Sequence, residues 1–281
     1  MRITDKFSVS MAVYIRDDEK HFRTAVESVV EQTMTPDEIL IVVDGPITQQ
    51  LDSSLADLQN SCETIRIIRL EKNMGHGKAR QIGLENCRNE LVALMDSDDI
   101  SMPDRFEKQL ECFSLNQDLA VVGGSIEEFI DLPEHVVGAR SVPVSNGEIR
   151  KYAKYRCPMN QMTVMLKKSE ALNAGGYIHW YCDEDYYLWI RMIERGCVFH
   201  NIPEALVRVR VGNDMYQRRG GWEYFNSERR LQGYMYNAGM ITLAEWIFNV
   251  TIRFCIQVMI PNKVRGFLFQ TFFRTRDRAT Q

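Results

Sequence analysis

Residues 91–105 read LVALMDSDDISMPDR, and this stretch decides the fold class of the chain. Five apolar residues, typical of a buried strand, are followed within four positions by three carboxylates, Asp96, Asp98 and Asp99. Pro103 comes next, and because proline suits a first helical turn, the segment PDRFEKQLECF is predicted to be a helix. A strand with acidic residues at its end is typical of open α/β sheets, which bind ligands at the carboxyl ends of their strands.

The D-x-D spacing of Asp96 and Asp98 suits a divalent cation. Carboxylate oxygens are preferred ligands of Mg²⁺ and Mn²⁺, and either cation can also hold a diphosphate. Carboxylates this close repel one another unless a cation or hydrogen-bond donors compensate, which favours a bound Mn²⁺ or Mg²⁺ at this cluster. The alternative is an acidic turn that caps the next helix, since carboxylates also stabilise helix N-termini.

Upstream of this stretch, apolar runs alternate with amphipathic segments. Strands are expected at 7–15, 39–43, 64–70 and 90–95, and helices at 19–33, 48–60 and 77–87. This order predicts a mainly parallel central sheet flanked by helices, because parallel neighbours need a crossover connection. Downstream, strands are expected at 120–124, 163–166, 198–202 and 205–211, a hairpin or irregular region at 129–145, and a helix at 184–195.

With 281 residues, the chain can hold one large α/β domain with an extension. We expect a main domain over residues 1–212 and a helical, membrane-apposed extension over 213–281. Seven scattered cysteines without a C-x-x-C pair suit a reducing cytosol, and the opening segment predicts a first strand with no secretory signal.

Charge is distributed unevenly along the chain. Residues 1–207 carry 22 Lys and Arg against 33 Asp and Glu, whereas residues 208–281 carry 12 against 5. An acidic main domain argues against a nucleic-acid partner. The basic end suits an anionic membrane or a phosphate-bearing ligand, and a solvated basic tail is the alternative.

Residues 243–260 contain 13 apolar residues among 18 and predict a helix. Its polar residues recur at every fourth position, at Glu245, Asn249, Arg253 and Gln257, so a wide apolar face remains. Such a face is expected in a core, at a partner or at a membrane interface, and the internal charges argue against a membrane span. The arginines and phenylalanines of residues 263–278 favour an anionic leaflet, with an intramolecular or dimer helix as the alternative.

Three further segments carry candidate binding groups. Tyr14 ends the first strand, where its ring is placed to stack on a nucleobase; the alternative is a core tyrosine. Asp44 ends the second strand, where it is placed to accept a hydrogen bond from a base N–H; the alternative is that it only makes the turn with Gly45. Lys78 and Arg80 lie near the start of a helix, against the preference of the helix dipole, which indicates an anionic ligand. The spacing of a Walker phosphate loop is absent here.

A second acidic cluster stands at Asp183, Glu184 and Asp185, directly before an amphipathic helix. Helix capping is one interpretation of it. The other is a general base, because a carboxylate held in a cleft can take a proton from an acceptor hydroxyl.

Five segments in this order resemble the family 2 glycosyltransferases, which are inverting enzymes of the GT-A (nucleotide-diphospho-sugar transferase) fold. They are AVYIRDDEKHFRTAVESVVEQT, PDEILIVVDGP, NMGHGKARQIGL, LVALMDSDDISMPDR and GGYIHWYCDEDYYLWIRMIERG, spread over roughly residues 7–212.

The resemblance implies a role for each matched residue. Tyr14 and Asp44 would contact uracil, Arg80 the nucleotide, and Asp96 the ribose or a metal-bound water. Asp98 would ligate the metal and Asp185 would be the catalytic base. The chain departs from the family pattern at two single positions: Val43 stands where family members often have an acidic residue, and Gln81 where they commonly have Asn. The spacing from Gln217 to Trp222 also differs from the Q-x-x-R-W motif of processive members.

The function implied is transfer of one sugar per encounter from a UDP-sugar to a lipid-linked saccharide, as in bacterial O-antigen and exopolysaccharide synthesis at the cytoplasmic membrane face. Two other classes stay open: a sugar-nucleotide nucleotidyltransferase, although the first strand lacks the Gly-rich basic loop such an enzyme needs, and a non-catalytic sugar-nucleotide-binding protein.

Overall fold

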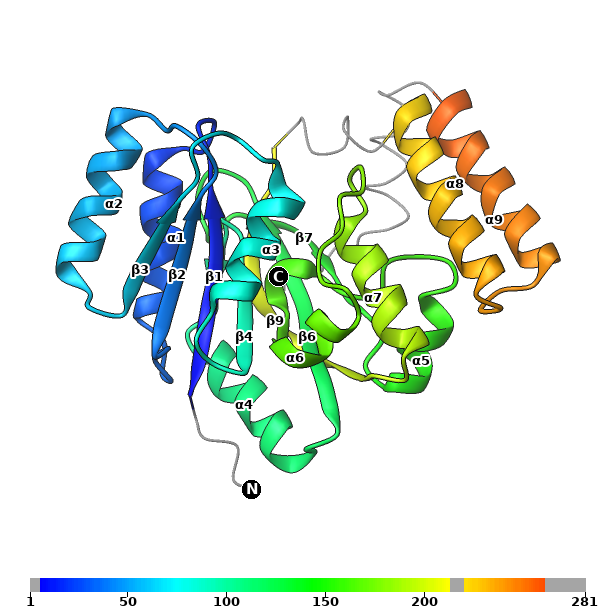
Figure 1. Cartoon of the computed structure of the whole chain (residues 1–281), viewed down its shortest axis with the longest axis horizontal. Helices are drawn as coiled ribbons and strands as arrows, with labels where there is room; N and C mark the ends of the chain where they lie inside the picture. Colours follow the sequence, from blue (N-terminus) through cyan, green and yellow to red (C-terminus); the bar gives the residue numbers. More distant parts are fainter. Residues whose placement is uncertain (1–5, 213–219, 261–281) are drawn as a thin grey trace, which may run out of the picture.

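The structure, a computed structural model, describes residues 6–212 and 220–260 (Figure 1). Its first half alternates strands and helices as the sequence predicts. The elements are β1 (Phe7–Val13), α1 (Glu19–Val30), β2 (Glu38–Val43), α2 (Gln49–Ser61), β3 (Ile65–Arg69), α3 (His76–Asn86) and β4 (Leu91–Met95). The four strands are parallel, in the order β3-β2-β1-β4.

The second half extends this sheet with strands of both directions. Its elements are β5 (Ile100–Ser101), α4 (Arg105–Leu115), β6 (Leu119–Phe129), β7 (Val136–Arg140), α5 (Asn146–Tyr152), β8 (Met165–Lys167), α6 (Lys168–Asn173), α7 (Glu184–Glu194) and β9 (Val198–Arg210). Strand β8 runs antiparallel between β4 and β6, while β6 and β9 are parallel. Within the two described ranges, nine strands form one sheet, and the predicted α/β class is confirmed.

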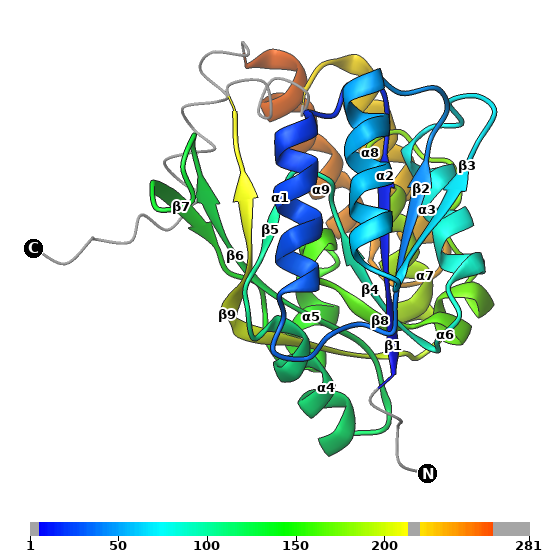
Figure 2. The same cartoon turned by 90° about the vertical axis from the view of Figure 1, so that its left-hand side faces the viewer.

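Helices cover both faces of the sheet, since successive strand residues point to opposite sides. Ile39 and Ile41 pack with the apolar residues of α1, α2 and α4, whereas Leu40 packs with those of α3 and α7. Figure 2 shows α1 and α2 side by side on the first face. This three-layer arrangement explains why β2 is apolar at five of its six positions and buried throughout.

Several expected boundaries differ from the structure, for example that of β6, which runs five residues beyond the predicted 120–124, and two of the differences have a local cause. The strands predicted at 198–202 and 205–211 form one strand, β9. Pro203 and Glu204 are an exposed bulge within it, and pairing with β6 continues on both sides: Ile202 pairs with Gly124, and Ala205 pairs with Ser125. A bulge accepts proline because the residue need not donate to the ladder. The helix predicted to open at Pro103 begins at Arg105 instead, with Asp104 at its N-cap.

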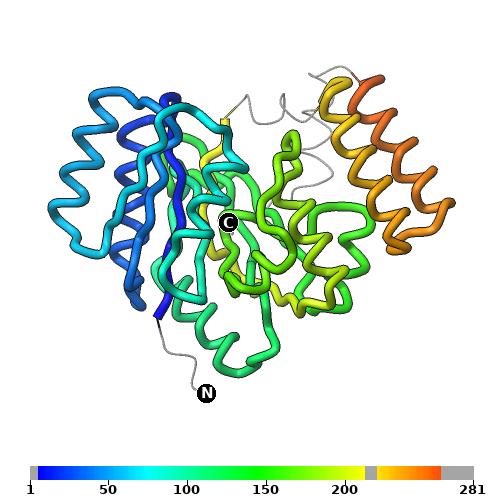
Figure 3. Tube along the Cα trace, viewed as in Figure 1, coloured from blue at the N-terminus to red at the C-terminus, as the bar shows by residue number. Residues whose placement is uncertain are grey.

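The C-terminal extension forms a pair of packed helices, α8 (Trp222–Asn237) and α9 (Leu243–Phe254), at the edge of the molecule (Figures 1 and 3). Helix α8 lies within the extension that was expected to be helical, although no bounds were predicted for it. The predicted helix at 243–260 is confirmed: a capping box of Thr242 and Glu245 opens α9, and a π-helical turn, Cys255–Met259, ends it.

No helix in residues 6–212 and 220–260 is long and apolar enough to cross a membrane. The basic-aromatic residues 261–281 and the expected domain boundary, which adjoins 213–219, lie outside the described residues.

Candidate active site

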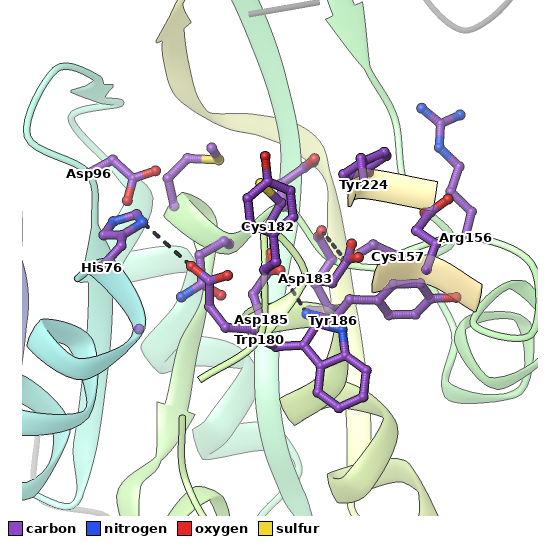
Figure 4. A pocket seen from close by; sticks show the side chains of 18 of the residues that line it. His76, Asp96, Arg156, Cys157, Trp180, Cys182, Asp183, Asp185, Tyr186 and Tyr224 are labelled. Carbon is purple, nitrogen blue, oxygen red and sulfur yellow. Dashed lines mark hydrogen bonds and ion pairs between the residues drawn. The ribbon is translucent and has the colours of Figure 1, made fainter. Parts of the chain in front are cut away.

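A cleft of about 980 Å³ opens beyond the carboxyl ends of the parallel strands. Its walls are the first turn of α3, the acidic residues after β4, the loop that leads into α7, and one side of α8 and α9. Both acidic clusters recognised in the sequence line this single cleft, although about 85 positions separate them in the chain (Figure 4).

The three carboxylates after β4 have different surroundings. Asp99 is buried, and its Oδ1 accepts a hydrogen bond from the Arg210 backbone N–H at 3.0 Å. Asp98 faces the cleft, where loss of solvation and then the charges of Asp96 and Asp17 raise its pKa to about 6. Burial followed by the Asp98 charge raises the pKa of Asp99 well above its usual value. Ionising Asp98 and Asp99 together with Asp96 is therefore unfavourable unless a positive charge lies beside them.

This donor set fits a divalent cation. Among the described residues, no three His, Cys, Asp or Glu side chains converge as a complete set of metal ligands. Asp96 and Asp98 supply carboxylate oxygens to the same cleft, and Mg²⁺ and Mn²⁺ commonly take only one or two protein carboxylates together with phosphate oxygens and water. An Mn²⁺ or Mg²⁺ ion at Asp98, with Asp96 beside it, stays a prediction that the chemistry of these residues supports.

Arg80 connects the two acidic clusters. Its Nη2 donates to Asp96 Oδ1 at 2.7 Å, and its Nη1 lies 3.8 Å from Glu184 Oε1. Burial alone would lower the pKa of Arg80, but Asp96 and the other acidic groups around it, Glu184 among them, outweigh burial and raise that pKa. The guanidinium is therefore a fixed positive charge at the centre of the cleft.

Asp185 lies in the first turn of α7 and lines the cleft, where its Oδ1 accepts from the Tyr186 backbone N–H at 2.7 Å. Asp183 occupies the N-cap position of α7, yet its side chain makes no capping bond. The Asp183 carboxylate instead accepts from the Ser227 hydroxyl of α8 at 3.0 Å. The capping interpretation of this cluster is wrong for Asp183, because its carboxylate turns away from its own helix.

His76 is a cleft residue for which the sequence analysis predicted no role. Its imidazole lies 3.6 Å from Glu184 of the second acidic cluster, as the dashed line in Figure 4 shows. The charge of Arg80, and then burial, lower the pKa of His76 to about 4, so the imidazole is neutral at pH 7. His76 lies two residues before Lys78 in the sequence, but nothing in the spacing shows that it meets Glu184.

The other predicted binding residues, Tyr14, Asp44 and Lys78, do not line this cleft, and Asp44 is buried. Both Asp44 carboxylate oxygens accept backbone N–H groups, from Met74 at 2.6 Å and Gly75 at 3.0 Å, so Asp44 shapes the loop before α3. Each oxygen keeps a lone pair, so a contact to a base is compatible with this role. Tyr14 is 36% exposed after β1, and Lys78 is exposed on α3 without lining the cleft.

The extension also forms part of the site. Tyr224 and Glu228 of α8 and Arg253 of α9 line the cleft opposite Asp96. Arg253 Nε lies 3.0 Å from a carboxylate oxygen of Glu228, which ties the two helices together.

The sequence profile of Glycosyl transferase family 2 matches residues 8–175. The chain belongs to glycosyltransferase family 2. Glycosyltransferase activity therefore accounts for the cleft, and the match gives no support to the nucleotidyltransferase or the non-catalytic alternative.

Full-length relatives agree with this assignment. An uncharacterised glycosyltransferase of Haemophilus influenzae is 39% identical over 96% of this chain and 99% of its own length. The Escherichia coli UDP-Gal:alpha-D-GlcNAc-diphosphoundecaprenol beta-1,3-galactosyltransferase is 37% identical over 96% of this chain and 98% of its own length. The amylovoran biosynthesis glycosyltransferase AmsE of Erwinia amylovora is 34% identical over 94% of this chain and 98% of its own length.

Solved structures support the GT-A-like fold. Staphylococcus aureus TarS gives a TM-score of 0.62 at 18% identity, over 95% of this chain and 46% of that one. The mannosyltransferase PcManGT of Pyrobaculum calidifontis, solved with GDP-Man and Mn²⁺, gives a TM-score of 0.61 at 13% identity, over 95% of this chain and 79% of that one.

Proposed function

We propose that this glycosyltransferase moves one sugar from a UDP-sugar to a hydroxyl of a lipid-linked saccharide, with inversion at the anomeric carbon. The observation that carries the proposal is that one cleft holds Asp185 together with Asp96 and Asp98, with Arg80 between the two groups. The acceptor class is supported by the Escherichia coli relative, whose name specifies a diphosphoundecaprenol-linked GlcNAc.

In this mechanism Asp185 is the general base. Its carboxylate takes the proton of the acceptor hydroxyl while that oxygen forms a bond to the anomeric carbon. The bond from that carbon to the diphosphate oxygen breaks, and UDP leaves with the electron pair. One displacement from the face opposite the leaving group gives inversion. An ionised carboxylate within hydrogen-bond reach of the hydroxyl can take its proton as the new bond forms.

The other residues hold the donor in place. We assign Tyr14 and Asp44 to the uracil, Arg80 and the Asp96 carboxylate to the nucleotide, and Lys78 to the approach of the anionic donor. A bound Mn²⁺ or Mg²⁺ at Asp98 would supply Lewis-acid stabilisation of the charge on the departing diphosphate.

The proposed acceptor also implies a location. An undecaprenyl-type lipid resides in a bilayer, so the enzyme would work at a membrane surface, and we propose the inner face of the cytoplasmic membrane. The pathway would then be the synthesis of a bacterial surface polysaccharide; the Erwinia relative is named for amylovoran biosynthesis.

A donor screen tests the proposal. The purified chain is incubated with UDP-Gal, UDP-Glc, UDP-GlcNAc or UDP-GalNAc and a short-chain GlcNAc-diphospholipid, and released UDP is measured. We expect one donor to be favoured, with UDP-Gal the first to examine because of the Escherichia coli relative. The proposal fails if no UDP-sugar is bound or consumed while a GDP- or dTDP-sugar is.

A further inference from the structure

Helix α9 turns polar residues toward the protein and, apart from residues such as Trp246 that pack on the core, turns apolar residues outward. Asn249 is only 3% exposed, whereas Ile247 is 51%, Phe248 59% and Met259, in the π-helical turn, 66% exposed. Surface helices normally show the reverse arrangement, with the apolar stripe against the protein.

Specific contacts fix this orientation. Asn249 Nδ2 donates to Gln232 Oε1 of α8 at 2.8 Å and to the Lys154 carbonyl oxygen at 3.0 Å. Arg253 Nη2 donates to the Tyr155 carbonyl oxygen at 2.6 Å. Turning α9 to hide its apolar face would break these bonds and bury apolar groups in their place, leaving the Gln232 amide and two carbonyls without partners. The exposed apolar face is therefore a stable property of the fold.

The exposed residues gather on one side of the helix. At 100° per residue, Ala244, Ile247, Phe248 and Ile252 share one face of α9, and none of them is buried. We call these four residues the outer face of α9. Met259 is exposed in the π-helical turn that follows. Trp222, 61% exposed at the start of α8, stacks on Phe225 and adds apolar surface at the end where α9 finishes. Contiguous apolar patches of this kind mark interaction sites.

The outer face also reaches the active-site cleft. Ile252 belongs to the face and lines the cleft, as does Ile256 one turn later. Figure 1 shows α9 as the outermost helix on the side of the molecule away from α1 and α2. A surface lying against this face would therefore stand next to the mouth of the cleft.

We propose that the outer face of α9 docks on an anionic membrane. Charge complementarity favours this occupant, because the chain continues directly after α9 with five basic residues and a single acidic one: Lys263, Arg265, Arg274, Arg276 and Arg278 against Asp277. Basic residues beside an apolar helix face bind anionic bilayers by both electrostatic attraction and apolar burial.

Membrane docking by the outer face of α9 follows from this helix and from the sequence after it. Only the purpose of docking, which is to present a lipid-linked acceptor to the cleft, rests on the proposed function. The test is sedimentation of the full chain with phosphatidylcholine vesicles containing about 30% phosphatidylglycerol, which needs no catalysis. Ile247→Glu/Phe248→Glu places two charges on the outer face, outside the cleft. The matched control is Leu115→Glu, which changes an apolar residue that is 80% exposed at the end of α4.

We expect the wild type and Leu115→Glu to sediment with the vesicles, and Ile247→Glu/Phe248→Glu to bind roughly ten-fold or more weakly, since two apolar side chains are replaced by charges. UDP-sugar binding should be equal in all three proteins, so a failed donor assay would refute the proposed function without touching this surface. The docking proposal is overturned if the double variant binds vesicles like the wild type, or if wild type ignores vesicles and dimerises through this face.

Discussion

Arg80→Met is the substitution that most directly probes how the cleft holds together. The guanidinium lies 2.7 Å from Asp96 and 3.8 Å from Glu184, with only 12% of the Arg80 side chain exposed. Removing one partner of a buried ion pair typically destabilises a protein by 3–5 kcal/mol. Because 26% of Asp96 is exposed to the cleft, solvent reduces this effect, and we expect about 2–3 kcal/mol.

For a chain of 281 residues, roughly 2 °C of melting temperature corresponds to 1 kcal/mol, so Arg80→Met should melt about 4–6 °C lower by thermal denaturation. Arg88→Met is the control, since Arg88 is 70% exposed beside Glu38 and its loss should change stability by less than about 0.5 kcal/mol. UDP-sugar affinity should fall in Arg80→Met and stay unchanged in Arg88→Met. Equal melting temperatures for the wild type and Arg80→Met would refute the idea that this bridge joins the two walls of the cleft.

Two further predictions concern metal and pH. EDTA should abolish sugar transfer and added Mn²⁺ or Mg²⁺ restore it, while Asp98→Ala should lose transfer with an unchanged melting temperature; full turnover after exhaustive chelation would contradict this. Burial raises the pKa of Glu38, but bonds from the Arg88 N–H, Ser8 and Arg66 outweigh it, so the folded pKa lies below the usual 4.5. Its ionised form therefore stabilises the fold above pH 4.5 and this contribution is lost as pH falls through the folded pKa. Urea unfolding should show Glu38→Gln about 1.5–3 kcal/mol less stable at pH 7, with the difference shrinking below pH 4.5; a gap independent of pH would contradict it.

The sequence predicted the parallel half of the sheet because its signals are local. Leu91–Met95 is a continuous apolar run, and β2 is apolar at five of six positions, so burial on both faces is written into each segment. The bounds of helix α8 were not predicted because polar residues such as Gln232 are buried in it, against α9, and interrupt the apolar periodicity.

Individual residues of the site could be predicted from the sequence, but the contacts between residues from distant segments could not. Carboxylates at a strand end and before a helix can be recognised from neighbouring residues alone. The meeting of His76 with Glu184, and of Ser227 with Asp183, depends on how distant elements pack. The same holds for α9, whose apolar pattern predicted an amphipathic helix but not that its polar side would face the protein.

The measurement that tests the central claim most directly is the rate of sugar transfer by Asp185→Asn with saturating donor. Asparagine keeps the shape of aspartate but cannot take a proton at neutral pH, so we expect turnover to fall by roughly 10²–10⁴ with donor affinity unchanged in calorimetry. Asp183→Asn, which can still accept the bond from Ser227, should stay within a few-fold of the wild type. Turnover of Asp185→Asn close to the wild-type rate would contradict the account and move the base to another carboxylate of the cleft.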